Sequence, residues 1–417
     1  MKVVVLGAGV VGVTTAFELA RDGHDVTVID RCEGPALETS HANGGQLSWD
    51  HGEPLAAPGV VQQALTWLGK RDAPLLYRLR LDPQLWSWTL KFLGNCREPA
   101  YWRNAERILR VALYARERLH DILKTERIAF DHNRGGILGL YQGARELDRE
   151  VDNIRAWQEI EGSRRALDRK GCIEVEPSLA HSTFLIAGGI HTPHDESGDC
   201  YEFTCQLATR AESLGVTFQW NTTVKGFKRE GWEVTHAVTD RGDEDADVFV
   251  LALGSYSPLV MKGLDLDLPI YPAKGYSVTA PVLDDAMAPK ISITSNTHKL
   301  VFSRLGNNLR VAGMLDLNGY DTELVEARAR LTLDNALKIF PRACEADHAT
   351  FWTGLRPLTP DSVPIVGRAK QHNLILNTGH GMLGWTLATG TARMVADLAR
   401  GHVPDVDMDG LGWERFA

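Results

Sequence analysis

The sequence predicts an α/β protein in two parts, one built on a parallel sheet and the other an α+β unit on a mainly antiparallel sheet. The first part is indicated by the opening of the chain, where an apolar strand, a glycine-rich turn, a helix and a second apolar strand follow one another. The second part is indicated by successive strand patterns with turn residues between them over 271–315. A chain of 417 residues has room for two domains.

The opening segment has the pattern of a dinucleotide-binding unit. Val3–Leu6 are continuously apolar, as expected for a parallel strand buried on both faces. Gly7, Gly9 and Gly12 follow in the spacing G-x-G-x-x-G. The first permits a tight turn, the second lets the backbone approach a pyrophosphate, and the third lets helix and strand pack closely. The helix expected over about 11–21 directs its free N–H groups at the phosphates, so we predict a Rossmann-like domain here.

A second apolar strand, Val26–Ile29, ends in Asp30. A carboxylate at this point accepts hydrogen bonds from both ribose hydroxyls and repels a 2′-phosphate, which disfavours NADP. The glycine turn by itself does not separate FAD from NAD.

Residues 31–60 form a long loop-rich stretch, and such loops inside compact proteins are usually functional. Its segment "SHANGGQ" is rich in small residues that let a backbone approach a flat ring and offer it hydrogen bonds; the alternative is an ordinary surface turn. The candidates in this segment are Ser40, Asn43, Gly44, Gly45 and Gln46.

Residues 62–130 have a helical pattern, and the segment 73–95 within them combines aromatic, apolar and basic residues. Two interpretations stay open for this segment. It is either a core helix whose basic side chains reach solvent at the rim, or a patch that contacts a membrane surface.

The middle of the chain supplies further elements of both parts. A strand is expected over 135–141, a helix over 144–162, a helix over about 200–214 with a strand running into Val224, and an apolar parallel strand in 245–257 that ends near Gly254. His191, His194, Asp195 and Asp199 lie close together, but we expect a polar loop and no metal site. The expected nucleotide domain is discontinuous, with residues 1–60, 188–262 and 355–417; the expected substrate domain has residues 61–187 and 263–354.

Arg356 lies in "TGLRPLTP", where glycine and two prolines make a rigid setting for a cation. A guanidinium binds a carboxylate with two charge-assisted hydrogen bonds, which orients the bound molecule as well as holding it. The alternative role is a structural ion pair.

The segment "LILNTGHGMLGWT" (374–386) is again strand, glycine turn and helix, with Gly379, Gly381 and Gly384 in the turn. It lacks the spacing G-x-G-x-x-G, so it is no second pyrophosphate site. His380 either acts as a base or supports the turn.

Composition excludes several classes of function. A net charge of −9 argues against nucleic acid as a partner. The six cysteines show neither a C-x-x-C pair nor zinc spacing, which is typical of free thiols in a reducing compartment. The first residues do not have the pattern of a secretory signal, and no apolar run approaches membrane-span length. We therefore expect a cytoplasmic protein that is soluble or attached only to a membrane surface.

These segments, in this order, resemble the flavin-dependent amine and amino-acid oxidoreductases of the glycine oxidase/D-amino-acid oxidase superfamily. Within it they are most similar to the small, FAD-carrying subunits of bacterial D-amino acid dehydrogenases. The similarity runs nearly end to end through "VVLGAGVVGV", "VTVIDR", "ALETSHANGGQLS", "DESGDC", "YPAKGYS", "WTGLRPLTPD", "VPIVGR" and "LNTGHGMLGWT".

The resemblance implies an extended FAD held by most of the candidates above. The turn at Gly7–Gly12 would bind the pyrophosphate and Asp30 the ribose, while the strand through Val224 would pass near the adenine. The implied cofactor contacts are Gly7, Gly9, Val10, Val11, Gly12, Asp30, Arg31, Ser40, Asn43, Gly44, Gly45, Gln46, Val224, Gly254, Gly379, His380, Gly381 and Met382.

The resemblance also implies a substrate site. Arg356 would bind the substrate carboxylate, and Tyr271 and Tyr276 would lie on the sheet that covers the substrate. The Cα–H bond of the bound amino acid would then point at flavin N5 for hydride transfer. The product would be an imine, which water hydrolyses to a 2-oxo acid and ammonia. The turn at Gly379–Met382 would face the negative charge that gathers at the far end of a reduced flavin, and this favours FAD over NAD.

Two segments depart from the family pattern. Residues 47–60, "LSWDHGEPLAAPGV", lack the aromatic, proline-rich sequence expected beside the pocket, which leaves substrate preference open. Leu355–Arg356 stand where sarcosine oxidases carry a flavin-linking cysteine, so non-covalent FAD is expected.

The resemblance implies that the electron acceptor is a quinone or other respiratory-chain carrier. It also implies a location at the cytoplasmic face of the inner membrane, with residues 75–93 in peripheral contact with the membrane. A partner subunit is possible under this resemblance but is not required by it. Three alternatives stay open: a cyclic imino acid dehydrogenase acting on D-proline or hydroxyproline, a glycine/sarcosine-type amine oxidase using oxygen, and a dinucleotide-binding sensor or assembly subunit without turnover.

Overall fold

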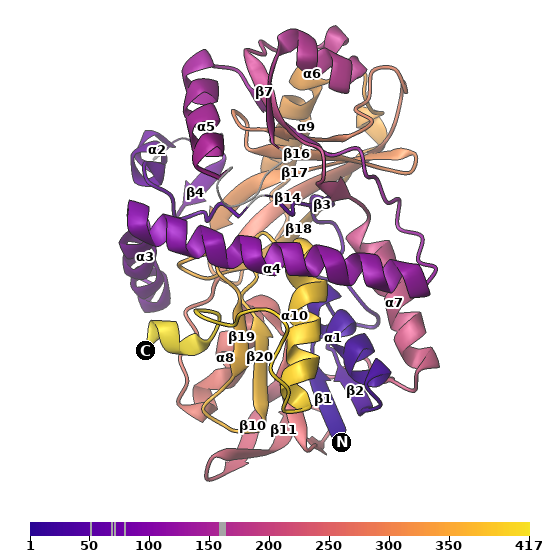
Figure 1. Cartoon of the computed structure of the whole chain (residues 1–417), viewed down its shortest axis with the longest axis vertical. Helices are drawn as coiled ribbons and strands as arrows, with labels where there is room; N and C mark the ends of the chain where they lie inside the picture. The colour runs from indigo at the N-terminus through magenta and orange to yellow at the C-terminus, as the bar shows by residue number, and fades with distance from the viewer. Residues whose placement is uncertain (51, 68–69, 71, 79–80, 158–163) are drawn as a thin grey trace.

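The computed structural model describes residues 1–50, 52–67, 70, 72–78, 81–157 and 164–417. Two sheets organise the chain, one at each end of its long axis in Figure 1, and the long helix α4 (Glu98–Thr125) crosses between them. This confirms the predicted fold class, a parallel-sheet nucleotide part beside a mainly antiparallel α+β part.

The first sheet has six strands in the order β19-β20-β13-β1-β2-β9. Its strands are parallel except for the edge pair of β19 and β20. Their bounds are β1 (Lys2–Leu6), β2 (Asp25–Ile29), β9 (Thr217–Gln219), β13 (Val248–Leu251), β19 (Ile365–Arg368) and β20 (Leu374–Thr378).

Both faces of this sheet are covered, which explains why its strands are apolar without alternation. Val3 and Val5 of β1 pack with residues of α4 and of the helices α1 (Val10–Arg21), α7 (Cys200–Ser213) and α10 (Gly384–Ala399). Val4 and Leu6 face the other way, toward the short helix α8 (Ser257–Met261) and a small sheet. The small sheet consists of β10 (Val224–Glu230), β11 (Glu233–Thr239) and β12 (Asp243–Asp245).

The second sheet has nine strands, and its described pairs are antiparallel except β15 with β5 and β17 with β4. One face packs on α9 (Glu326–Ile339), and the small two-stranded sheet of β3 (Gln46–Leu47) and β8 (Glu196–Ser197) lies outside it. The strand bounds are β4 (Leu75–Tyr77), β5 (Ile137–Tyr141), β6 (Arg165–Asp168), β7 (Gly188–Thr192), β14 (Tyr271–Pro281), β15 (Ser292–Ser295), β16 (Leu300–Leu305), β17 (Asn308–Leu317) and β18 (Thr350–Leu358).

The remaining helices lie mainly around the second sheet, with α2, α3 and α5 together on one side of the molecule (Figure 1). The predicted helix 144–162 corresponds to α5, and its positions 158–162 lie outside the described residues. The bounds are α2 (Val60–Trp67), α3 (Pro83–Asn95), α5 (Ala144–Trp157) and α6 (Arg169–Val175), and the short 3₁₀ turns are η1 (Pro177–His181), η2 (Gly254–Tyr256), η3 (Lys262–Leu264), η4 (Ala346–His348) and η5 (Trp413–Phe416).

Three segments depart from the predicted division of the chain. Strand β7 begins at residue 188 but pairs with β5 and β6 of the second sheet, because its backbone continues their antiparallel ladder. Strand β18 crosses the predicted boundary at 355 and pairs with β14 as far as Leu358. Val224 begins β10 of the small sheet instead of ending a strand of the large one, since β9 already stops at Gln219. The remaining boundaries stay a prediction.

Candidate functional site

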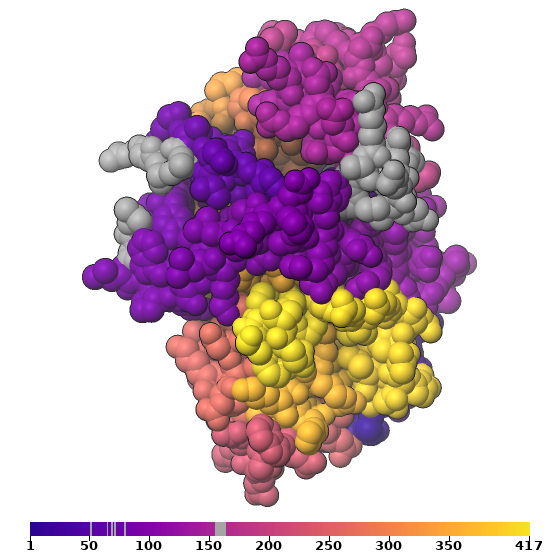
Figure 2. Space-filling model, turned by 60° about the vertical axis from the view of Figure 1, so that its left-hand side comes forward, coloured from indigo at the N-terminus to yellow at the C-terminus, as the bar shows by residue number. Residues whose placement is uncertain are grey.

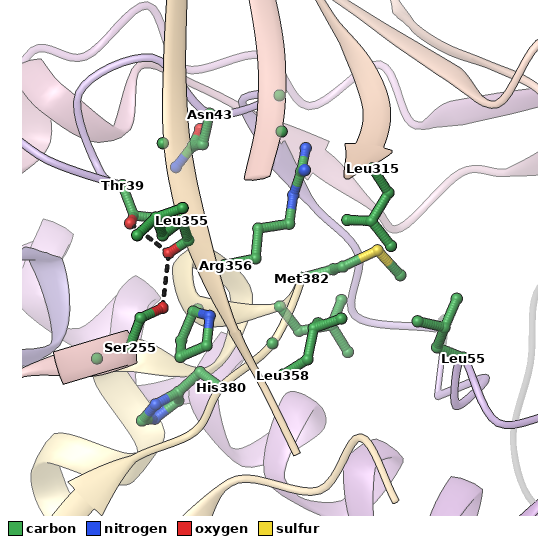
Figure 3. A pocket seen from close by; sticks show the side chains of 18 of the residues that line it. Thr39, Asn43, Leu55, Ser255, Leu315, Leu355, Arg356, Leu358, His380 and Met382 are labelled. Atoms are coloured by element: carbon green, nitrogen blue, oxygen red, sulfur yellow. Dashed lines mark hydrogen bonds between the residues drawn. The ribbon is translucent and has the colours of Figure 1, made fainter. Parts of the chain in front are cut away.

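A cavity of about 1460 Å³ lies between the two large sheets. It exceeds the roughly 300–1,000 Å³ common for sites of one small ligand, so it has room for an extended cofactor together with a second molecule. The ends of β1, β2 and β13 line it from one side, and β14, β16, β17 and β18 line it from the other. Figure 3 shows the part of the cavity around Arg356.

The first glycine turn joins β1 to α1 at the cavity. Gly7 has φ +105°, a conformation that favours glycine, and its N–H donates to the carbonyl of Ile29. A Cβ on Gly12 would lie 1.8 Å from the carbonyl oxygen of Gly7, so only glycine allows this helix to start so close to the strand. A Cβ on Gly9 would meet only the Ser40 hydroxyl, at 3.4 Å, and Gly9 itself lines the cavity.

Two helices begin at the same cavity without a side-chain cap from their own N-cap residues, although the N–H of Val10 at the start of α1 donates to the hydroxyl of Ser40. Gly9 precedes α1 and Leu383 precedes α10, and neither residue has a side chain able to cap a helix. In contrast, the carboxylate of Asp199 caps α7 by accepting from two backbone N–H groups. The first turns of α1 and α10 also carry no acidic side chain. The positive ends of both helix dipoles are therefore available to negative groups of a bound molecule.

Asp30 lies at the end of β2 and lines the cavity. Its carboxylate accepts from the N–H of Ala8 at 2.6 Å and from the N–H of Cys32 at 2.8 Å, which ties the ends of β1 and β2 together. A carboxylate has about four acceptor positions, so capacity for ribose hydroxyls remains. Arg31 also lines the cavity, but it pairs with Glu38 and lies 3.9 Å over the ring of Tyr256.

The loop 40–46 is held from both sheets. The N–H of Val10 donates to the hydroxyl of Ser40, and the Asn43 side chain accepts from the N–H of Gly45. On the far side the hydroxyl of Ser303 donates to the carbonyl of Gly44, and the Gln46 amide donates to two hydroxyls of β15. The predicted small residues are thus fixed at the wall of the cavity and do not form a surface turn.

The carboxylate of Glu196 is held by two histidines and fixes strand β8, which pairs with strand β3 at the end of this loop. Glu196 of β8 pairs with Leu47 of β3, and its oxygens lie 2.8 Å from Nε2 of His120 and 2.7 Å from Nε2 of His132. Burial acts to raise the pKa of Glu196, but the histidine hydrogen bonds outweigh it and hold the pKa at about 2. The nearby His191 and Asp199 also have structural partners, the carbonyl of Gly135 and the start of α7.

The second glycine turn brings α10 to the cavity. Gly379 and Gly381 have φ of +73° and +57°, and a Cβ on Gly379 would lie 2.8 Å from the side chain of Thr359. The N–H of Gly381 donates to the carbonyl of Pro357, which fixes the turn against β18. Gly381 and Met382 line the cavity, while Gly379 shapes the turn behind it.

His380 supports this turn. It is buried, and its Nε2 lies 3.1 Å from the hydroxyl of Thr391 in α10. Burial lowers the pKa of His380 to about 3, so the imidazole is neutral near pH 7. A buried imidazole with so low a pKa is a poor proton acceptor, which favours the supporting role over the catalytic one.

The pH dependence of stability tests this assignment. The unfolded histidine takes up a proton near pH 6.5 and the folded one only near pH 3, so stability falls as the pH falls through this interval. At pH 5 the loss approaches about 2 kcal/mol. The melting temperature of His380→Asn should therefore change less than that of the wild type between about pH 7.5 and pH 5. His402→Asn, at an exposed site, is the matched control, and equal pH slopes in all three proteins would contradict the assignment.

Arg356 projects from β18 into the cavity (Figure 3). The strand is fixed at this point because the carbonyl of Leu355 accepts from the hydroxyls of Thr39 at 2.8 Å and Ser255 at 3.0 Å. One Nη of Arg356 donates to the carbonyl of Met314 at 3.3 Å, and in the described part of the chain the guanidinium forms no ion pair. Burial lowers its pKa to about 10, which still leaves it protonated near pH 7. The predicted alternative, a structural ion pair, has no partner among the described residues.

The guanidinium lies over Gly275 of the neighbouring strand β14. A Cβ at position 275 would lie 1.7 Å from Nη1 of Arg356, so glycine is required for this position of the arginine. Leu55, Leu315, Leu358 and Met382 give the same part of the cavity apolar side chains (Figure 3). Leu55 comes from the segment that departs from the family pattern, and residue 51 of that segment lies outside the described residues. Sequence patterns did not indicate Gly275, Thr39, Leu55 or Leu315 as site residues.

Of the two predicted tyrosines Tyr276 lines the cavity and Tyr271 does not. Tyr271 is buried outside the cavity wall, and its hydroxyl donates to Asp82 at 2.9 Å. Tyr276 lines the cavity, but its hydroxyl donates to Asp316, which also pairs with Arg328. Burial, and then the charge of Asp316, raise the pKa of Tyr276. Both hydroxyls are engaged in the protein, so we assign neither a catalytic role.

The structure thus brings most predicted site residues to one cavity. Gly12, Gly379 and Tyr271 do not line it, and the two glycines act through the backbone geometry of the turns. The predicted residues that line it are Gly7, Gly9, Val10, Val11, Asp30, Arg31, Ser40, Asn43, Gly44, Gly45, Gln46, Val224, Gly254, Tyr276, Arg356, His380, Gly381 and Met382.

Comparison with known proteins identifies the class. A family model described as FAD dependent oxidoreductase matches residues 2–398, so this chain belongs to that family and is an FAD-dependent oxidoreductase. It is 49% identical over 419 residues to a D-amino acid dehydrogenase of Paramagnetospirillum magneticum, covering 100% of this chain and 99% of the relative. It is 44% identical over 416 residues to a D-amino acid dehydrogenase of Rhizobium rhizogenes, covering both chains fully.

A solved structure shares the fold. The glycine oxidase of Geobacillus kaustophilus superposes with a TM-score of 0.74 at 20% identity, covering 99% of this chain and 97% of the other. Among the described residues, no helix combines the length and the apolar character that crossing a membrane requires.

Proposed function

We propose that this chain oxidises D-amino acids to 2-oxo acids and ammonia. The proposal rests mainly on Arg356. This cation has no carboxylate partner among the described residues, and it faces a cavity with many apolar side chains in its lining. Such a cation suits a small molecule that presents a carboxylate and an apolar side chain. The relatives named D-amino acid dehydrogenase at 44–49% identity support the same substrate class.

The residues around the cavity fit FAD. The turn at Gly7–Gly12 and the open start of α1 suit the pyrophosphate, because Gly9 leaves room for close approach and the helix end favours negative charge. We assign Asp30 to the ribose, Val224 to the adenine side, and loop 40–46 with the start of α10 to the ring system. The second open helix end suits the negative charge of a reduced ring.

We propose that FAD is bound without a covalent link. Positions 355 and 356 are leucine and arginine, and Cys32 is the described cysteine that lines the cavity. Burial raises the pKa of the Cys32 thiol to about 11, with the charge of Asp30 as the next cause, so little thiolate is available near pH 7.

When bound, FAD supplies an acceptor for two electrons. Arg356 binds the α-carboxylate with two charge-assisted hydrogen bonds and thereby fixes the orientation of Cα. Leu55, Leu315 and Met382 exclude water and favour the neutral amine over ammonium. The amino acid loses two electrons and two protons to become an imine, and water converts the imine to the 2-oxo acid and ammonia. Holding the reacting atoms in place accounts for about 7–11 kcal/mol of barrier reduction in well-oriented reactions.

Substrate profiling tests the proposal against its enzymatic alternatives. With an artificial dye as acceptor, we expect turnover of D-alanine and other D-amino acids with apolar side chains. Preference for D-proline would indicate a cyclic imino acid dehydrogenase, and preference for glycine or sarcosine an amine oxidase. Either of these preferences would contradict the proposal.

We further propose that the acceptor is a membrane quinone and that the protein binds the cytoplasmic face of the inner membrane peripherally. Stopped-flow measurement of the rate at which oxygen or a quinone reoxidises the reduced enzyme tests this acceptor. Slow reoxidation in air and fast reoxidation by a short-chain quinone are expected. Fast peroxide formation in air would contradict the dehydrogenase assignment and indicate an oxidase.

A further inference from the structure

Helix α3 exposes an apolar face. Its buried side, with Leu85 and Trp88, packs on Tyr271 and Leu358. The other side carries large apolar residues at helical spacing, and one more lies just before the helix. Their exposed fractions are 104% for Leu81, 44% for Trp86, 71% for Leu90 and 42% for Leu93. An apolar face of this kind on an otherwise packed helix marks a contact with a partner.

This face is continuous with the cavity. Leu93 is exposed and also lines the cavity, together with Thr89 and Phe92 from the same helix. The neighbouring helix α2 contributes the apolar Val60, Val61, Ala64 and Trp67 to the lining, and also the polar Gln62, Gln63 and Thr66. The two helices therefore form an apolar rim where the cavity meets the surface. In Figure 2 the side of the molecule that carries them faces the viewer.

The surroundings of the rim are basic although the protein is acidic. Among its described residues the segment 75–97 contains Arg78, Lys91 and Arg97 but only one acid, Asp82, in a chain with a net charge of −9. Asp82 is engaged, because it caps α3 and accepts from the hydroxyl of Tyr271.

A second, smaller hollow of about 250 Å³ lies beside α3 at the C-terminal residues. It is lined by Lys91 of α3 and by Arg103, Arg107 and Arg415, together with Asp361 and Ala417 among others. Asp361 is already paired with Arg415, and Arg107 with Asp409. Lys91 and Arg103 form no ion pair with another described residue, so the hollow keeps positive charge next to the apolar face.

An apolar face bordered by basic side chains is complementary to a bilayer that contains anionic phospholipids. We propose that the rim of α2 and α3 docks on such a bilayer, and that a lipid-soluble electron acceptor enters the cavity through it. This inference rests on the proposed transfer of electrons to a membrane quinone. A water-soluble amino acid has no need of an apolar rim, whereas an acceptor dissolved in lipid does.

Vesicle flotation of the FAD-loaded enzyme tests the docking surface. The wild-type protein should float with vesicles of phosphatidylcholine and phosphatidylglycerol. A smaller fraction of it should float with vesicles of pure phosphatidylcholine. The variant Leu81→Glu/Leu90→Glu changes residues that are exposed and do not line the cavity. Its affinity for the anionic vesicles should be lower than that of the wild type by a factor of about ten or more. Leu185→Glu/Leu283→Glu, at exposed leucines on other segments, should bind as the wild type does.

Activity then separates docking from catalysis. The docking variant should keep wild-type turnover with a water-soluble dye and lose about tenfold or more with a long-chain quinone embedded in vesicles. Vesicle binding equal to the wild type, a wild type that does not bind vesicles, or equal losses with both acceptors would overturn the inference. A wild-type dimer that the variant dissociates, without vesicle binding, would assign the face to a second copy and overturn it as well. Failure of wild-type reduction by D-amino acids would instead contradict the proposed function, because flotation needs no turnover.

Discussion

Replacement of Arg356 by alanine is expected to raise KM for the D-amino acid about 10²–10⁴-fold and to leave the FAD content unchanged. Hydrogen bonds to charged groups contribute about 1.5–3 kcal/mol each, and every 1.36 kcal/mol corresponds to a factor of ten. The loss of a two-pronged contact therefore accounts for this range. FAD content is spared because the assigned pyrophosphate turn lies on β1 and α1, whereas Arg356 lies on β18.

Arg356→Lys is the matched control for charge. Lysine keeps the cation but not the planar fork, so an intermediate KM is expected. Steady-state kinetics with a dye acceptor, together with the flavin absorbance of the purified variants, provides the measurement. A KM that barely changes in the alanine variant would refute the assignment of the carboxylate site.

Replacement of Gly12 by alanine is expected to abolish FAD binding and lower stability. The added Cβ would lie 1.8 Å from the backbone oxygen of Gly7, so α1 must move away from β1 and the turn between them must deform. Overpacking of this kind costs about 1–3 kcal/mol, which lowers the melting temperature by several degrees. The displaced helix end also loses its alignment with the phosphates.

Gly263→Ala serves as the control, because nothing lies within 4 Å of the Cβ it would add. The ratio of flavin to protein absorbance and the melting temperature report both effects. A Gly12→Ala protein with a full complement of FAD would show that the first glycine turn does not hold the cofactor as assigned.

The parts that the sequence predicted well depend on local pattern. The spacing of Gly7, Gly9 and Gly12 between an apolar strand and a helix needs only neighbouring residues, and the structure shows the turn at the cavity. The same holds for the second turn, where the glycine positions were recognisable and the left-handed φ values of Gly379 and Gly381 explain them.

The features that the sequence did not reveal depend on contacts between distant residues. Tyr271 and Tyr276 lie on a strand that is buried on both faces, so alternation does not tell which side faces the cavity. Their partners, Asp82 and Asp316, are 189 and 40 residues away along the chain. The need for glycine at 275 follows from the pairing of β14 with β18, whose register cannot be read from either strand alone. The short, Gly-rich strand β7 also belongs to the other part than predicted, and the residues of β5 that pair with it precede their partners by as many as 55 residues.

Arg356 and the residues assigned to FAD line one cavity, where we propose that D-amino acids are oxidised. The most direct measurement is the visible absorbance of the purified, yellow protein mixed with a D-amino acid without oxygen. We expect that D-alanine or a D-amino acid with a larger apolar side chain bleaches the flavin band and that the L-enantiomer does not. The Arg356→Ala variant should require far higher concentrations of the D-amino acid for the same bleaching. A flavin band that no D-amino acid bleaches would contradict the account and favour a sensor or assembly subunit, and bleaching by the L-enantiomer alone would contradict the proposed substrate class.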